Sequence, residues 1–360
     1  MTRVRPFALS AIHVEAGILV SAGSCFAKIF GDLPQSAVLV TDEKVEPLYA
    51  DRLHSSIGSA GWTVATMTVP VGETSKSLDQ AGRLYEALAE IRFPRDGVVV
   101  ALGGGVVCDL AGFVAATWMR GVDLALCPTT LEADIDAAIG GKTAVNLGAG
   151  KNLVGAFHPA RLVLIDPTCL RTLDLRDVRA GLAESIKHAL IASEEFLSWH
   201  ESRLDDVMSL RDAALTELIE RNVAIKSAIV SRDPFETTGE RMFLNFGHTI
   251  GHAIENACGY SLRHGECVGL GMLAACRLSE QVAGLPSEVT RRVEALLQRV
   301  GLPTRLPEPI PVETILEAIG RDKKARAGGI RFVLLEGVAR PVIRTEVGRE
   351  DVVAVYRALV

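Results

Sequence analysis

The sequence lacks several features that would assign a protein class at once. Its seven cysteines are scattered and form no C-x-x-C pair, which argues against a disulfide framework and a thiolate zinc site. No block of lysine and arginine indicates a nucleic-acid-binding face, and the net charge is -6. No uncharged stretch reaches about 18 residues, so we expect no transmembrane helix. His13 and Glu15 interrupt the apolar N-terminal stretch, so we expect no signal peptide.

What is present is typical of a globular protein. The chain has 360 residues, of which 48% are hydrophobic, enough for two domains with cores of their own. The 33 glycines and 15 prolines are spread along the chain, which excludes a collagen-like or linker composition. Unpaired cysteines suit a reducing compartment, so the composition indicates a cytoplasmic enzyme.

The hydrophobic pattern changes near residue 174. Before it, short apolar runs alternate with helix-length patterns at 77–91 and 109–119, which is typical of βαβ units; the runs are 37–41, 61–69, 98–102, 124–127 and 162–165. After it, the pattern is mostly helical, over 178–191, 210–231, 247–257, 268–281 and 287–300, with a strand-like return at 330–335. We predict an α/β domain with a mainly parallel sheet over residues 1–173 and a mostly α-helical domain over 174–360.

Two glycine-rich segments are candidates for binding phosphate. Gly103-Gly104-Gly105 follows an apolar run, but Cys108 stands at the third glycine of a G-x-G-x-x-G pattern, so a structural turn is the alternative. Gly140-Gly141-Lys142-Thr143 ends like a P-loop, but Asp136 stands at the earlier glycine position. The nearby Lys151, Asn146 and Asn152 on flexible backbone indicate either an oxyanion cradle or a solvated loop. The basic cluster at 320–326 is either a solvated turn or the closure of an anionic site.

A third pattern resembles a metal site. His248 and His252 lie four residues apart on one expected helical face, and His264 follows. Thr249 stands where a zincin needs glutamate, which disfavours a metalloprotease. Glu184 and Lys187 lie three residues apart on an otherwise apolar helix, and a surface ion pair is the alternative reading. Two histidines with one carboxylate are a common catalytic zinc arrangement.

Taken in order along the chain, these segments closely resemble the 3-dehydroquinate synthase family of sugar phosphate cyclases. The motifs that carry the resemblance are Leu102-Gly103-Gly104-Gly105, Asp109-Leu110-Ala111-Gly112-Phe113, Met119-Arg120-Gly121, Pro128-Thr129-Thr130-Leu131, Gly140-Gly141-Lys142-Thr143, Gly150-Lys151-Asn152, Ala183-Glu184, Ile186-Lys187, Asn245-Phe246-Gly247-His248-Thr249, His264-Gly265-Glu266 and Asp322-Lys323-Lys324.

The resemblance implies a nucleotide-binding α/β domain and a helical metal domain, usually in a homodimer. It also implies a reaction: conversion of 3-deoxy-D-arabino-heptulosonate 7-phosphate to 3-dehydroquinate and phosphate, in the shikimate pathway, with bound NAD⁺ and Zn²⁺ (or Co²⁺).

The resemblance further implies a role for each matching position. The implied metal ligands are Glu184, His248 and His264. His252 matches a position off the metal, near the substrate, and Arg120 matches one that reaches the phosphate of a neighbouring subunit. The other implied substrate-binding residues are Asp136, Lys142, Asn152, Lys187, Lys226, Arg241, Asn245 and Lys324, with Lys323 as another register for the last. The implied NAD-binding residues are Asp42, Glu73, Lys76, Gly104, Gly105, Asp109, Thr129, Thr130, Lys151, Thr172 and Leu173.

Several features depart from the family pattern, including Asp174 where proline is usual and a segment 233–241 that is one residue longer than common. Cys108 replaces a glycine, and Glu132 and Asp134 add charge before Asp136, where an anionic substrate is expected. An aminodehydroquinate synthase shares nearly all the motifs and is the main alternative. An inosose synthase lacks Gly-Gly-Lys at 140–142 and carries glutamate at 245, and an epi-valiolone synthase is disfavoured by the intact Asp322-Lys323-Lys324. A metal-dependent polyol or glycerol-phosphate dehydrogenase, which would release NADH, is the alternative from another reaction class, and a non-enzymatic binding module is a remote third.

Overall fold

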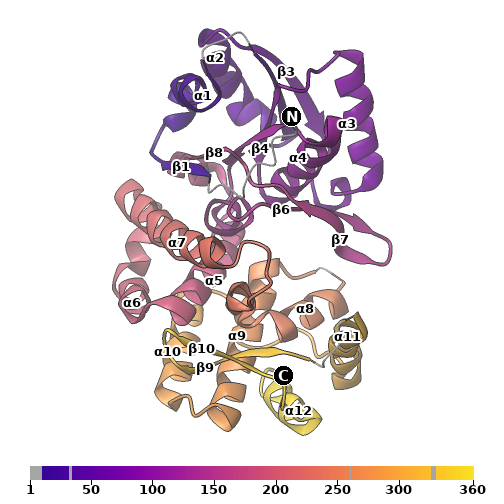
Figure 1. Cartoon of the computed structure of the whole chain (residues 1–360). Coiled ribbons are helices and arrows are strands. Elements are labelled where there is room, and N and C mark those ends of the chain that lie inside the picture. Colours follow the sequence, from indigo (N-terminus) through magenta and orange to yellow (C-terminus); the bar gives the residue numbers. More distant parts are fainter. Residues whose placement is uncertain (1–9, 32–34, 260, 326–329) are drawn as a thin grey trace. The chain divides into compact units, whose positions relative to one another are not determined.

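The computed structural model describes residues 10–31, 35–259, 261–325 and 330–360, without the side chains of 321–325. By their contacts the residues form two compact units, Met1–Leu173 with Leu215–Ser227, and Asp174–Ala214 with Ala228–Val360. The segment Leu215–Ser227, expected in the helical domain, therefore belongs to the first unit. Figure 1 shows both units, with many of their helices and strands labelled.

The first unit is built on a six-stranded sheet in which every neighbouring pair is parallel. The strand order is β1 (Ala11–Val14), β8 (Leu162–Ile165), β5 (Asp123–Pro128), β4 (Val98–Gly103), β2 (Ser36–Asp42) and β3 (Thr63–Val69). Every residue of β4 and β8 is buried. This agrees with their continuous apolar sequences, which are typical of strands covered on both faces. The helices are α1 (Ala22–Phe30), α2 (Asp51–Ser59), α3 (Leu78–Glu90) and α4 (Gly105–Thr117). The predicted α/β class is confirmed.

The order of the strands reverses between β2 and β4. From β2 the chain moves outward to β3, then returns to β4 on the other side and continues through β5 to β8. In open parallel sheets, ligands bind outside the carboxyl ends of the strands at such a reversal. Here these ends are Asp42 of β2 and Gly103 of β4.

A small antiparallel hairpin covers the segment expected as flexible backbone. It consists of β6 (Lys142–Leu147) and β7 (Gly150–Phe157), with a register shift between Val145 and Leu147. The predicted irregular loop is therefore wrong. Its glycines and polar residues obscured a strand pair in which Thr143 and Val145 are buried and Lys142 is exposed.

The second unit is mostly helical, as predicted. Its helices are α5 (Leu175–Ala192), α6 (Glu194–Met208), α8 (His248–Ala257), α9 (His264–Val282), α10 (Ser287–Val300), α11 (Val312–Ala325) and α12 (Arg349–Arg357); α7 (Asp212–Arg232) is divided between the units. A hairpin of β9 (Phe332–Gly337) and β10 (Arg340–Arg344) completes the unit. No helix among the described residues combines the length and apolarity needed to cross a membrane.

Candidate active site

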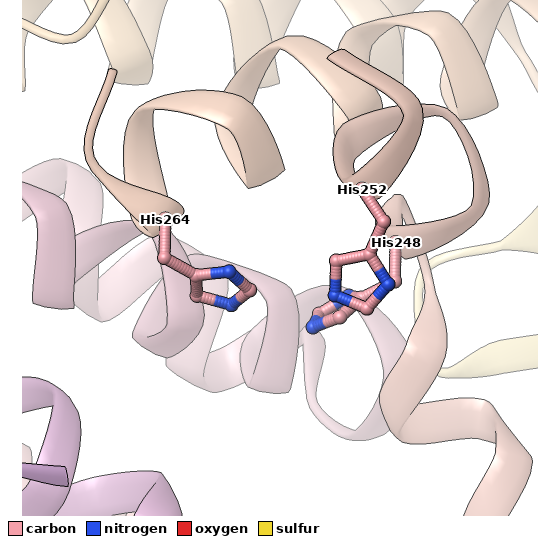
Figure 2. Close-up of side chains that lie close together, drawn as sticks. All are labelled: His248, His252 and His264. Atoms are coloured by element: carbon pink, nitrogen blue, oxygen red, sulfur yellow. The ribbon is translucent and has the colours of Figure 1, made fainter. Parts of the chain in front are cut away.

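Three side chains of the second unit converge on one point. Glu184 lies in the middle of α5, and His248 and His264 are the first residues of α8 and α9. Glu184 Oε1 lies 3.5 Å from Nε2 of His248 and 3.4 Å from Nε2 of His264. The imidazoles of His248, His252 and His264 point toward one another in Figure 2. The structure therefore brings together all three predicted metal ligands, with His252 beside them.

Two glycines allow the helices that carry these ligands to approach closely. A Cβ on Gly265, next to His264, would lie 1.9 Å from the carbonyl oxygen of Ala180 on α5. A Cβ on Gly271 of α9 would lie 2.0 Å from the carbonyl oxygen of Gly247, next to His248. These distances are far below van der Waals contact, so no larger residue fits at either glycine. Backbone contacts thus set the spacing of the three ligands.

The electrostatics at Glu184 and His248 suit a metal. Burial raises the pKa of Glu184, but Lys187 and the two histidines outweigh it and hold that pKa well below its usual range. Burial lowers the pKa of His248 well below its usual range, despite the attraction of Glu184. The carboxylate is therefore ionised and the imidazole neutral, which are the forms that bind a metal ion.

The pair of Glu184 and Lys187 is buried, not on the surface. Their side chains are 1% and 2% exposed, and Lys187 Nζ donates to Glu184 Oε2. The reading of this pair as a surface ion pair is wrong, because α5 is surrounded by protein on almost every side. Oε1 of the same carboxylate is buried and has no hydrogen-bond partner within the described part of the chain.

The unpartnered oxygen provides a test of whether the residues fit a metal ion. Two ligand atoms bound at about 2.1 Å to a tetrahedral Zn²⁺ lie about 3.4 Å apart. The observed 3.4 and 3.5 Å from Glu184 Oε1 to the two Nε2 atoms match this spacing. Ligand atoms of His248, His252 and His264 also lie within 4.8 Å of one another. His252, however, is exposed, whereas Glu184 is fully buried with an oxygen left over. The donor set Glu184, His248 and His264 fits the ion best.

A separate hydrogen bond at Nδ1 orients the ring of His248 and that of His264. Nδ1 of His248 lies 3.2 Å from the carbonyl oxygen of Phe246. Nδ1 of His264 lies 3.3 Å from Oε2 of Glu255, near the end of α8. Sequence reasoning missed Glu255, because a glutamate late in a helix carries no signal of its own.

The glycine turn of the first unit lies at the reversal point of the sheet. Gly104 caps α4, which begins at Gly105, four residues earlier than predicted. The free N–H groups at a helix start and the positive end of its dipole favour an anion such as a pyrophosphate. Asp42 ends β2, and Thr129 donates its backbone N–H to the last residue of β4 at 3.1 Å, which places Thr129 and Thr130 beside the turn.

Lys76 connects the glycine turn with the β6–β7 hairpin. It is buried, and its Nζ donates to a carboxylate oxygen of Asp109 on α4 and, at 2.5 Å, to Oδ1 of Asn152 on β7. Asn146 on β6 accepts the backbone N–H of Asn152 at 2.9 Å and donates to Glu73 at 2.7 Å. Asn152 has a left-handed backbone, with φ of 57°. Five predicted or suspected binding residues thus form one network.

Two other predicted NAD-binding residues follow β8. The Thr172 and Tyr49 hydroxyls share a hydrogen bond of 2.6 Å, and Leu173 ends the first stretch of the first unit. Lys151 Nζ lies 3.9 Å from Oε1 of Glu73. Tyr49 carried no sequence signal.

The structure places the predicted substrate residues in both units. In the first unit, Lys226 on α7 is buried and donates to the Asp136 backbone carbonyl and carboxylate, at 2.6 and 2.5 Å. Arg120 is exposed there, with a left-handed φ of 68°. In the second, Arg241 is buried and Asn245 half-buried, both in the turn Glu240–Asn245. The predicted roles of Lys323 and Lys324 fall on side chains outside the described residues.

Asp134 is one of the two acidic residues noted before Asp136 in the sequence. It lies in the π-helical turn Ala133–Ala137, is fully buried, and neither of its carboxyl oxygens has a hydrogen-bond partner among the described residues. Burial raises the pKa of Asp134 well above its usual range, and the charge of Asp166 adds to the rise. Burial therefore favours the uncharged form of this carboxyl, which weakens the expectation that Asp134 adds negative charge before Asp136.

Comparison with known proteins gives a consistent result. The family models "3-dehydroquinate synthase N-terminal" and "3-dehydroquinate synthase C-terminal" match residues 66–180 and 181–325. The chain is 45% identical over 327 residues to a 3-dehydroquinate synthase of Symbiobacterium thermophilum, covering 90% of each chain. It is 46% identical over 335 residues to one of Xylella fastidiosa, covering 91% of this chain and 90% of the relative.

Solved structures with the same fold carry the same kinds of cofactor. A 2-epi-5-epi-valiolone synthase of Streptomyces hygroscopicus, solved with NAD⁺ and Zn²⁺, superposes with a TM-score of 0.90 at 27% identity, over 100% of this chain and 99% of that one. A 2-deoxy-scyllo-inosose synthase complexed with carbaglucose-6-phosphate, NAD⁺ and Co²⁺ gives 0.88 at 26% identity, over 97% and 96%. A butanol dehydrogenase of Thermotoga maritima, at 14% identity and 0.71, shares the fold alone.

Proposed function

The chain belongs to the 3-dehydroquinate synthase family, and from this premise we propose that it converts 3-deoxy-D-arabino-heptulosonate 7-phosphate to 3-dehydroquinate and phosphate. One observation carries the choice among sugar phosphate cyclases. Identity to 3-dehydroquinate synthases is 45 to 46% in the relatives named above, but 26 to 27% to the valiolone and inosose synthases. The burial of Asp134 is compatible with this choice, since burial favours the uncharged form of that carboxyl near the binding site of an anionic substrate.

We assign Glu184, His248 and His264 to a divalent metal ion, and the edge of the sheet near Asp42 and Gly104 to NAD⁺. When bound, NAD⁺ supplies a reversible hydride acceptor, and the metal supplies a Lewis acid for the oxygen of the carbon that is oxidised. Lys187 donates to one oxygen of Glu184, and the other oxygen would bind the ion.

The remaining residues bind and orient the substrate. Lys142, Lys226 and Arg241 are cations suited to the phosphate and carboxylate groups. Asp136 and Asn245, with Asn152, offer acceptors and donors to hydroxyl groups. The hydrogen bonds of Lys226 to Asp136 hold both groups in place before substrate binds. A single substrate would stay bound through the successive steps of the reaction. Its reacting groups would then remain close together, which reduces the number of separate catalytic bases required. His252, exposed beside the proposed metal ligands, would contact substrate.

We further propose a homodimer in the cytoplasm. Leu153 and Phe157 of β7 are 60% and 41% exposed, and apolar side chains exposed together on a hairpin suit a protein contact. The exposed Arg120 would then serve a neighbouring subunit. All seven cysteines are free, which suits a reducing compartment.

The direct test is to mix the purified protein with Zn²⁺, NAD⁺ and 3-deoxy-D-arabino-heptulosonate 7-phosphate and measure phosphate release and product mass. We expect one equivalent each of phosphate and dehydroquinate, no net NADH, and loss of turnover with chelator. Turnover of an amino analogue alone would replace the proposal by an aminodehydroquinate synthase. Accumulation of NADH with a polyol would indicate a dehydrogenase. His264→Ala should lose metal and turnover together, and normal metal content in that variant would contradict the ligand assignment.

A further inference from the structure

We propose that Glu255 is a positioning residue that fixes the ring of His264 so that Nε2 faces the metal ion. The inference rests on the proposed metal site and assigns a role to a residue outside the three ligands. It follows from the contacts at the two ends of the His264 ring.

With a metal ion bound at Nε2, the hydrogen of a neutral His264 ring lies on Nδ1. Oε2 of Glu255 lies 3.3 Å from Nδ1, and Oε1 of Glu184 lies 3.4 Å from Nε2 at the opposite corner of the ring. A neutral imidazole has one N–H, and an ionised carboxylate can only accept a hydrogen bond. A hydrogen on Nδ1 serves Glu255 and leaves the lone pair of Nε2 for the ion, the arrangement usual for metal-binding histidines.

His264 depends on such a partner more than His248 does. The Nδ1 of His248 faces the Phe246 carbonyl two residues earlier in its own backbone, so no side chain is needed to orient that ring. The side chain of His264 is 28% exposed, compared with 12% for His248, so packing restrains it less. The tight contact of Gly265 with Ala180 fixes the backbone of His264 but leaves its ring torsions free.

The position of Glu255 disfavours a carboxylate, and its contact with His264 is one interaction that offsets the cost. It lies in the last turn of α8 and is 7% exposed. The carboxyl end of a helix carries partial negative charge, which disfavours a carboxylate there. A hydrogen bond to His264, and through it a divalent cation, offsets this cost.

The test is a double-mutant cycle on the metal-free full-length protein, with Zn²⁺ affinity measured by competition with a chromogenic chelator. Glu255→Leu should weaken Zn²⁺ binding by about 10- to 100-fold. Glu255→Gln, which keeps an acceptor oxygen, should lose less. In a His264→Ala background, with the weak residual affinity of the remaining ligands read at higher Zn²⁺ concentrations, Glu255→Leu should cause no further loss, because its effect passes through the ring that has been removed. An equal loss in both backgrounds, or no loss in either, would overturn the inference. Failure of the parent protein to bind Zn²⁺ would instead overturn the proposed metal site.

Discussion

Replacing the buried Asp134 by asparagine should stabilise the protein increasingly as pH rises. The folded protein holds the proton of this carboxyl, because burial raises its pKa well above the usual range and Asp166 adds to the rise. The unfolded chain releases that proton at about pH 3.9. Above that pH, unfolding therefore releases a proton, and the stability of the parent falls as pH rises until the folded pKa is reached.

The magnitude follows from this linkage. Between the unfolded-state and folded-state pKa values of Asp134, the free energy of unfolding of the parent falls by about 1.4 kcal/mol for each pH unit. An uncharged asparagine contributes no such pH dependence. For a folded pKa above 7, the difference between variant and parent should thus grow by about 3 kcal/mol from pH 5 to pH 7. With an unfolding entropy of about 2.1 cal/mol/K per residue, this corresponds to a relative rise in Tm of about 4 °C. The asparagine amide has unmet hydrogen bonds as well, but these shift the stability equally at every pH and leave the slope unchanged.

The assay is thermal unfolding of parent and Asp134→Asn at several pH values, with Asp51→Asn as a control. Asp51 starts α2 on the surface, so its substitution shows whether loss of any one negative charge has the same effect. A difference between parent and Asp134→Asn that stays constant from pH 5 to pH 7 would show an ionised carboxylate in the folded state. The argument from burial would then be wrong.

Three further outcomes follow from contacts described above. Gly265→Ala should lower the unfolding free energy by about 1–3 kcal/mol or more, measured by denaturant unfolding, because its methyl group would meet a backbone carbonyl at 1.9 Å. Asp233→Ala should raise KM for substrate by loosening the turn that holds Arg241, since the Asp233 carboxylate accepts four backbone N–H groups between residues 237 and 241. Burial raises the pKa of Asp233, but these hydrogen bonds outweigh burial and lower that pKa. The stability that they contribute is therefore fully present above about pH 4 and is lost as pH falls toward the lowered pKa. Lys142→Ala should raise KM while equilibrium dialysis shows unchanged NAD⁺ and Zn²⁺ binding, and loss of NAD⁺ binding would make Lys142 a cofactor residue.

The parallel sheet could be predicted because its central strands are buried on both faces. The runs at 98–102 and 162–165 are apolar throughout, and both became fully buried strands. The hairpin at 142–157 could not be predicted, since its strands are exposed at several positions and its glycines indicated a loop. Surface strands lack the hydrophobic pattern that makes buried strands recognisable.

In the metal site, too, some residues could be predicted from the sequence and others could not. His248, His252 and His264 could be selected because histidine is rare in this chain, and their grouping carried a signal. Glu184 looked like half of a surface ion pair, because the burial of α5 depends on the helices around it. Glu255 and Tyr49 support other residues through single hydrogen bonds between distant segments, and such bonds leave no mark on local sequence.

The division of α7 between the two units has a consequence for protein synthesis. The first unit is discontinuous, because Leu215–Ser227 completes it after an intervening stretch of the second. On the ribosome, the parallel sheet would have all its strands after Ile165 but would still lack Lys226, the partner of Asp136. A nascent chain cut at Leu173 would expose the surface that this helical segment covers. Completion of the nucleotide-binding unit must therefore wait until part of the helical unit has emerged, which ties the folding of the two units together in time.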